Sequence, residues 1–219
     1  LSLHDALPIL AGPEPDFAWR AFTDAVVQLV ERFGVSRSIG MNAIPWPAPH
    51  TRPVGVTAHA SDPSFVAGRP TFVGAIEVPG HLAGGIELAL GEAGHLALGF
   101  AAHIPHYLTQ VPFPQAAIAL LEEVGVAGSL SFDLSELELK AGESAREINE
   151  QLAGNAENEQ AVRDLEMQYD EIVRGAASAL PLPPMVHSPQ EMNSRHSWSS
   201  SCVNSMTIRV VRSSGGSTG

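Results

Sequence analysis

The sequence has few basic residues, a single cysteine and no apolar run long enough to cross a membrane. Its 12 lysines and arginines stand against 24 aspartates and glutamates, and the net charge of −12 disfavours binding to a nucleic-acid backbone. Cys202 alone can form neither an internal disulfide nor a cysteine-based zinc site, which is typical of a reducing compartment. The apolar run Ala97–Ile104 falls well short of the roughly 20 residues of a membrane helix. We therefore predict a cytoplasmic protein with no nucleic-acid or membrane partner.

Several motifs of catalytic and cofactor-binding sites are also missing. The sequence has no Gly-x-Ser-x-Gly elbow, no Walker loop and no Gly-x-Gly-x-x-Gly fingerprint, and Gly84-Gly85 lies inside a helical pattern. The histidines near the predicted strand ends, such as His103 and His106, lack the spacing of metal ligands on one element. We predict no catalytic residues, no metal and no cofactor.

The two ends of the chain differ in composition from the middle. Residues 1–9 resemble the translation of a sequencing adapter, and we interpret them as a scar rather than a signal peptide. Residues 175–219 are rich in Ser, Pro and Gly, which predicts a disordered tail. A frameshift near Pro183 is the alternative, because a shifted reading of this region yields an amphipathic helix. On either interpretation Cys202 and Trp198 carry no function.

Helical and strand-like segments alternate between these ends, in a stretch of the size of one domain. Apolar residues recur at helical spacing up to Phe33, and Gly34 is placed to end that helix. The predicted helices span 16–33, 82–93 and 115–124. The predicted strands span 35–44, 54–60, 71–78 and 96–104. This alternation predicts a partial α/β domain over residues 10–130, with three α/β/α layers and a parallel or mixed sheet.

Residues 131–174 are helical and acidic. Two apolar stripes at helical spacing are separated by Gly154-Asn155, which predicts a helical hairpin. The segment carries twelve acidic residues and four basic ones. This charge is the solvated face of the hairpin or, alternatively, an acidic docking surface.

Three segments carry a family resemblance. GPEPDFAW, AIPWPAPHTRPVGVTAHASDP and AAHIPHYLTQVPFPQAA, in this order, resemble the PAC2 family of proteasome-assembly-chaperone-2-like proteins, in its actinobacterial branch. The resemblance covers residues 10–174 and implies a phosphorylase/hydrolase-like fold with a C-terminal helical extension. It also implies a non-enzymatic assembly role with proteasome-related or other protein partners, and an N-terminally truncated chain. We expect the protein to form a homo-oligomer.

Two loop segments supply the candidate ligand-binding residues. His50, Thr51 and Arg52 lie in a loop stiffened by prolines, and His106 and Tyr107 follow an apolar strand. Ligands bind beyond the carboxyl ends of strands in α/β sheets, so we expect the two segments to meet in one cleft. Arginine is shaped for bidentate contacts with carboxylate or phosphate, and histidine titrates near neutral pH.

The same residues also have a purely structural interpretation. Arg52 would then pair with a nearby acid such as Asp62 or Glu77, and the prolines would only shape a rigid crossover. Three hypotheses about function stay open. The protein is a non-enzymatic interaction protein, or a small-molecule binder or ligase/hydrolase-like enzyme, or a truncated chain whose exposed sheet edge leaves it without function.

Overall fold

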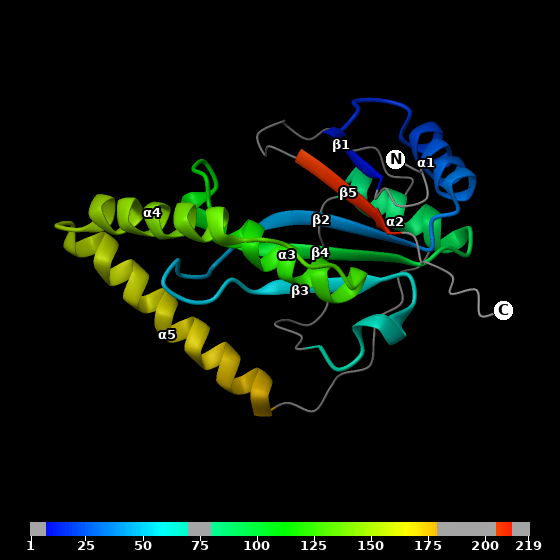
Figure 1. Ribbon diagram of the computed structural model, residues 1–219. Helices are drawn as coiled ribbons and strands as arrows, with labels where there is room; N and C mark the ends of the chain where they lie inside the picture. Colours follow the sequence, from blue (N-terminus) through cyan, green and yellow to red (C-terminus); the bar gives the residue numbers. More distant parts are fainter. Residues whose placement is uncertain (1–7, 70–79, 179–204, 212–219) are drawn as a thin grey trace.

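The computed structural model describes residues 8–69, 80–178 and 205–211 (Figure 1). The predicted strand at 71–78 lies outside these residues, as does most of the predicted scar at 1–9. The strands are β1 (Ile9–Pro13), β2 (Arg37–Trp46), β3 (Val56–Ala60), β4 (Ala97–Pro105) and β5 (Ser205–Val211). The helices are α1 (Trp19–Phe33), α2 (Leu82–Glu92), α3 (Pro114–Gly128), α4 (Ser135–Leu152) and α5 (Ala156–Ser178), with short 3-10 helices at Pro63–Val66 and His106–Leu108.

The strands form a mixed sheet in the order β1-β5-β2-β4-β3. Strands β2 and β4 are parallel, and the other neighbours are antiparallel. The predicted α/β class and mixed sheet are therefore confirmed. The structure differs from the expected structureless tail at residues 205–211, which form β5. The segment SMTIRVV alternates apolar and polar residues, a strand pattern that a composition rich in Ser, Pro and Gly on either side concealed.

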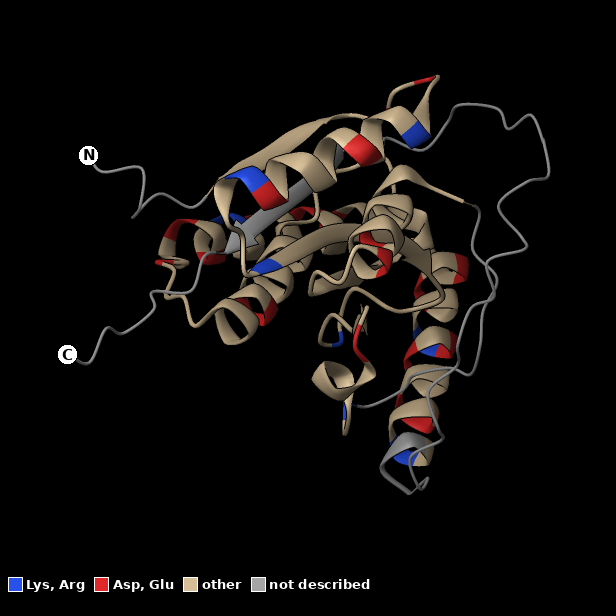
Figure 2. Ribbon diagram, turned by 90° about the vertical axis from the view of Figure 1, so that its right-hand side faces the viewer, with Lys and Arg blue, Asp and Glu red and all other residues tan. Residues whose placement is uncertain are grey.

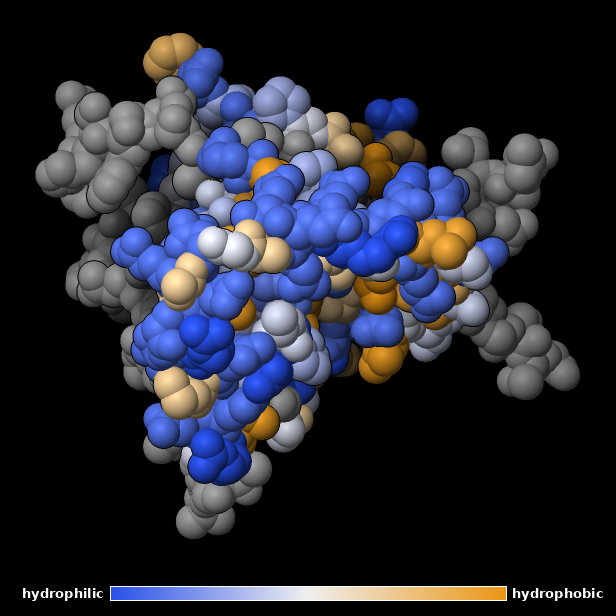
Figure 3. All heavy atoms as spheres, turned by 90° about the vertical axis from the view of Figure 1, so that its left-hand side faces the viewer, coloured by the Kyte–Doolittle hydropathy of each residue, from blue (hydrophilic) through white to orange (hydrophobic). Residues whose placement is uncertain are grey.

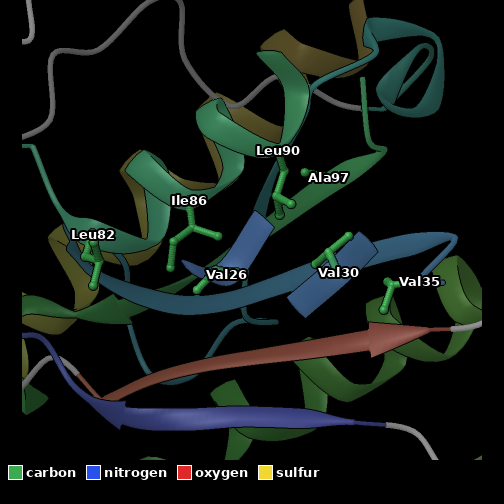
Figure 4. Close-up of a cluster of buried hydrophobic side chains, with 7 residues drawn as sticks. All are labelled: Val26, Val30, Val35, Leu82, Ile86, Leu90 and Ala97. Atoms are coloured by element: carbon green, nitrogen blue, oxygen red, sulfur yellow. The ribbon is translucent and has the colours of Figure 1, made fainter. Parts of the chain in front are cut away.

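Helices cover both faces of the sheet. Successive residues of β4 point to opposite sides of the sheet, and residues on both sides pack against helices. Ala97 packs with residues of α1 and α2, among them Val30 and Leu90. Figure 4 shows the side chains of this cluster between α2 and the sheet. On the other face, Phe100 packs in a cluster with Val124 of α3. The predicted three-layer arrangement follows from these two clusters.

Helix α1 begins and ends close to the predicted positions. Gly34 adopts a left-handed φ of 59°, and its backbone N–H donates to carbonyls of the last helical turn. Glycine takes this conformation with little steric cost, so the predicted C-cap is confirmed.

Helices α4 and α5 are joined by a short turn and then diverge (Figure 1). Gly154 in this turn has a φ of 82°, as the predicted break requires. Ala141 and Ile148 of α4 are buried, whereas Ile172 of α5 is 39% exposed. Acidic residues lie along α5 (Figure 2), and the face that carries the α4–α5 turn is mostly hydrophilic (Figure 3). None of the helices in the described parts of the chain is long and apolar enough to span a bilayer.

Candidate functional site

The proline-rich loop after β2 meets the end of β4, as the sequence predicts. The backbone N–H of His50 donates to the Tyr107 hydroxyl at 3.0 Å, and His50 Nδ1 lies 2.8 Å from the same oxygen. His50 Nε2 lies 3.1 Å from Oδ1 of Asn149 on α4. We call His50, Thr51, Arg52 and Tyr107 the β2–β3 notch. His106 is exposed and contacts the notch through its ring, 5.4 Å from that of Tyr107 and nearly perpendicular to it.

One neutral tautomer of His50 satisfies both ring contacts. The amide of Asn149 is oriented by its own Nδ2, which donates to the carbonyl of Ala145 at 2.8 Å, so Oδ1 faces His50 as an acceptor. Nε2 of His50 then carries the proton, and Nδ1 accepts from the Tyr107 hydroxyl. Burial raises the pKa of Tyr107, which keeps the phenol protonated for this role.

Arg52 is bound by two carboxylates of α5. Its Nε and Nη2 donate to Oδ1 and Oδ2 of Asp170, both at 2.9 Å, and its Nη1 lies 3.2 Å from Oε1 of Glu166. Thr51 donates its hydroxyl to the same Glu166 oxygen. The Tyr169 hydroxyl donates to the carbonyl of Pro53 at 3.0 Å. Arg52 thus makes the bidentate carboxylate contact that its chemistry favours.

The acids that pair with Arg52 are not the nearby ones. Asp62 instead accepts from the backbone N–H of Ser64 at 2.9 Å and caps the short helix at Pro63–Val66. Glu77 lies outside the described residues. The pairing that the structural interpretation predicts does exist, but its partners follow Arg52 by more than 110 residues in sequence.

The ion pair lies at the surface of the molecule. The side chains of Arg52, Glu166 and Asp170 are 32%, 25% and 44% exposed, so solvent weakens their attraction. The hydrogen bond from Arg52 lowers the pKa of Asp170, and the reciprocal bond raises the pKa of Arg52. Both groups therefore stay charged across the physiological pH range.

The site also contains residues of the helical extension that were not predicted from the sequence. Glu166 and Asp170 are spaced i, i+4, which places both carboxylates on one face of a helix. Tyr169 belongs to the apolar stripe that predicts α5. The spacing was a usable signal for a shared face, but it carried no information about which loop this face contacts.

A second group of polar side chains lies between α2 and the sheet. Nδ1 of His59 on β3 lies 2.6 Å from Oε1 of Glu87 on α2. His81 caps the start of α2 by accepting from the backbone N–H of Gly84 at 3.1 Å, and burial lowers its pKa. A cavity of about 20 Å³ beside these groups has room for one water molecule. Among the described residues, no three His, Cys, Asp or Glu side chains are grouped so that they could hold a metal ion.

His103 of β4 belongs to neither group. Its Nε2 lies 2.8 Å from the Thr57 hydroxyl, and its ring stacks on Trp46 with the centroids 4.3 Å apart. Burial lowers the pKa of His103 to about 4, so the ring is neutral at physiological pH. His103 of β4 thus contacts a residue of β3 and a residue of β2.

The chain is thus a three-layer α/β protein with an acidic helical extension. A model of the PAC2 family matches residues 3–152, which is more than half of the chain. The chain belongs to the PAC2 family. A comparison with curated proteins finds no match.

Solved structures from actinobacteria are similar to this chain. A Mycobacterium tuberculosis protein of unknown function is 37% identical with a TM-score of 0.73, over 78% of this chain and 63% of its own. A Corynebacterium glutamicum protein of unknown function is 36% identical with a TM-score of 0.70, over 75% of this chain and 61% of its own. A proteasome-assembly chaperone homologue of M. tuberculosis is 32% identical with a TM-score of 0.62, over 68% and 63%. The chain thus spans less than two thirds of these relatives.

Proposed function

We propose that the protein is a non-enzymatic interaction protein that assists the assembly of proteasome subunits. The observation that carries this proposal is the 32% identity to the M. tuberculosis proteasome-assembly chaperone homologue, over 68% of the chain. The notch agrees with it, because His50, Arg52 and Tyr107 bind other parts of the same chain.

The test uses purified actinobacterial proteasome α and β subunits, kept separate and then mixed with or without the full chain. We expect the chain to bind free subunits or an assembly intermediate, to raise the rate of core-particle formation, and to leave the finished particle. Native mass spectrometry and gel filtration over time measure all three. If the chain binds no subunit and the rate of assembly is unchanged, the proposal is wrong.

We also infer that the protein works in the cytoplasm as a homo-oligomer. Strand β3 is last in the order of the described strands, and a strand at the edge of a sheet can pair with a second copy of the chain. Light scattering on a concentration series of the full chain measures the oligomeric state. A monomer at every concentration contradicts this inference.

A further inference from the structure

The contact between α5 and the β2–β3 loop has the form of a recognition site. Three consecutive loop residues, Thr51, Arg52 and Pro53, offer a hydroxyl donor, a guanidinium and a carbonyl acceptor. Helix α5 contacts these groups through Glu166, Tyr169 and Asp170, which lie at i, i+3 and i+4 on one helical face. Each loop group thus meets a complementary group within about one helical turn.

The loop is held in place by contacts that do not involve α5. Ala48 and Pro49 are buried, and prolines at 47, 49 and 53 restrict the backbone. His50 is fixed from both sides by Tyr107 and Asn149. The loop backbone that carries Thr51 and Arg52 is therefore restrained by contacts outside α5, which lowers the entropic cost of binding a ligand there.

Helix α5 is held less firmly than the loop that receives it. It diverges from α4 after the turn at Gly154 (Figure 1), and its ion pairs with Arg52 are partly exposed. Met167, Ile172 and Val173 of α5 are 57%, 39% and 40% exposed, so this helix buries little apolar surface. Release of α5 from the loop consequently leaves the main core clusters intact.

We propose that the β2–β3 notch is a docking site for an acidic helix of a partner protein, and that α5 occupies it until such a helix displaces it. The helix that fits carries two carboxylates one turn apart, in the pattern of Glu166 and Asp170. The planar fork of Arg52 selects a carboxylate over a neutral amide. This site goes beyond the proteasome proposal, and its test does not depend on whether proteasome subunits bind.

The test uses the full chain and a peptide of residues 156–174, stapled so that it stays helical. Glu166→Ala with Asp170→Ala in the full chain opens the notch. We expect the peptide to bind this variant, to bind the wild-type chain more weakly because α5 competes, and to lose at least about tenfold in affinity when Arg52→Ala is added. Fluorescence anisotropy of the labelled peptide measures all three affinities.

One control has the same net charge as the opened chain, and a second control tests the two carboxylates of the peptide. The chain variant Glu157→Ala with Glu171→Ala removes two acids of α5 outside the notch, so the peptide should bind it as weakly as wild type. A peptide carrying Glu166→Ala and Asp170→Ala should not bind the opened chain. The proposal is overturned if the opened chain binds neither peptide, binds both equally, or binds the first one regardless of Arg52→Ala. It is also overturned if wild-type chains form dimers that E166A/D170A abolishes, because the occupant is then a second copy.

Discussion

Gly99 and Gly40 form a matched pair in which the same substitution should have opposite effects on stability. The two glycines are register partners on β4 and β2, and neither has a positive φ. A Cβ at position 99 would overlap the His59 ring and lie 2.6 Å from Oε2 of Glu87. Among the described parts of the chain, a Cβ at position 40 would have the carbonyl oxygen of Leu98 at 3.7 Å as its nearest neighbour, which is ordinary contact.

We expect Gly99→Ala to lower the free energy of unfolding by about 1–3 kcal/mol, the usual cost of overpacking. His59 is 47% exposed and can rotate toward solvent, but it then loses its hydrogen bond to Glu87. Gly40→Ala should raise the free energy of unfolding by about 0.4–1 kcal/mol, because it restricts only the unfolded chain. Urea denaturation followed by circular dichroism measures both values.

The double variant His59→Ala with Gly99→Ala separates the clash from any effect on the strand itself. Removal of the imidazole gives the new methyl group space and releases the Glu87 carboxylate from its hydrogen bond, so that it can move away from the methyl group. The double variant should therefore be no less stable than His59→Ala alone. If Gly99→Ala and Gly40→Ala change stability equally, or if His59→Ala does not relieve the loss, the His59–Glu87 pair does not fix the need for glycine at position 99.

Three further outcomes follow from burial and titration. Burial disfavours the charged form of His59, but the hydrogen bond and the attraction of Glu87 outweigh it and raise the pKa of His59 above 6.5. The stabilisation of the folded state by the His59–Glu87 pair should be complete below pH 6.5 and lost as the pH rises through the raised value. The free energy of unfolding of Glu87→Gln, measured across this range, should lack that loss. Burial lowers the pKa of His103 to about 4, so the contribution of the neutral ring to the stability of the fold should be present above pH 6.5 and fall as the pH drops toward 4. The NMR shifts of the ring should be those of a neutral imidazole at pH 5.5. A charged ring at that pH contradicts the assigned burial. Ile148→Ala should cost about 2–5 kcal/mol because this side chain is 5% exposed, whereas Leu139→Ala, at a site 72% exposed, should change stability by less than about 0.5 kcal/mol in the same urea assay.

Local patterns were enough to predict most of the fold. Apolar spacing with a terminal glycine predicted α1, and the apolar run near Phe100 predicted β4, because each signal lies within one element. The pairing of β5 with β1 and β2 could not be predicted in this way. Its partners lie far away in the sequence, and a period-2 pattern does not say which strand it pairs with.

The same limit applied to the candidate site. Arg52 does pair with a carboxylate, as its chemistry favours, and the loop that contains His50 does lie beside Tyr107. The identity of the carboxylate depended on where the turn at Gly154 directs α5. That direction is set by tertiary packing, which no single window of the sequence contains.

The position of β5 sets an order for folding during synthesis. Strand β5 lies between β1 and β2, although its residues are made almost 200 positions after those of β1. A ribosome releases the chain from its N-terminus onward, so β5, the strand that pairs with β1 among the described residues, emerges after the other described strands. The helices and the β2-β4-β3 strands can assemble while translation continues, and β1 can pair with β5 only after these elements have been made.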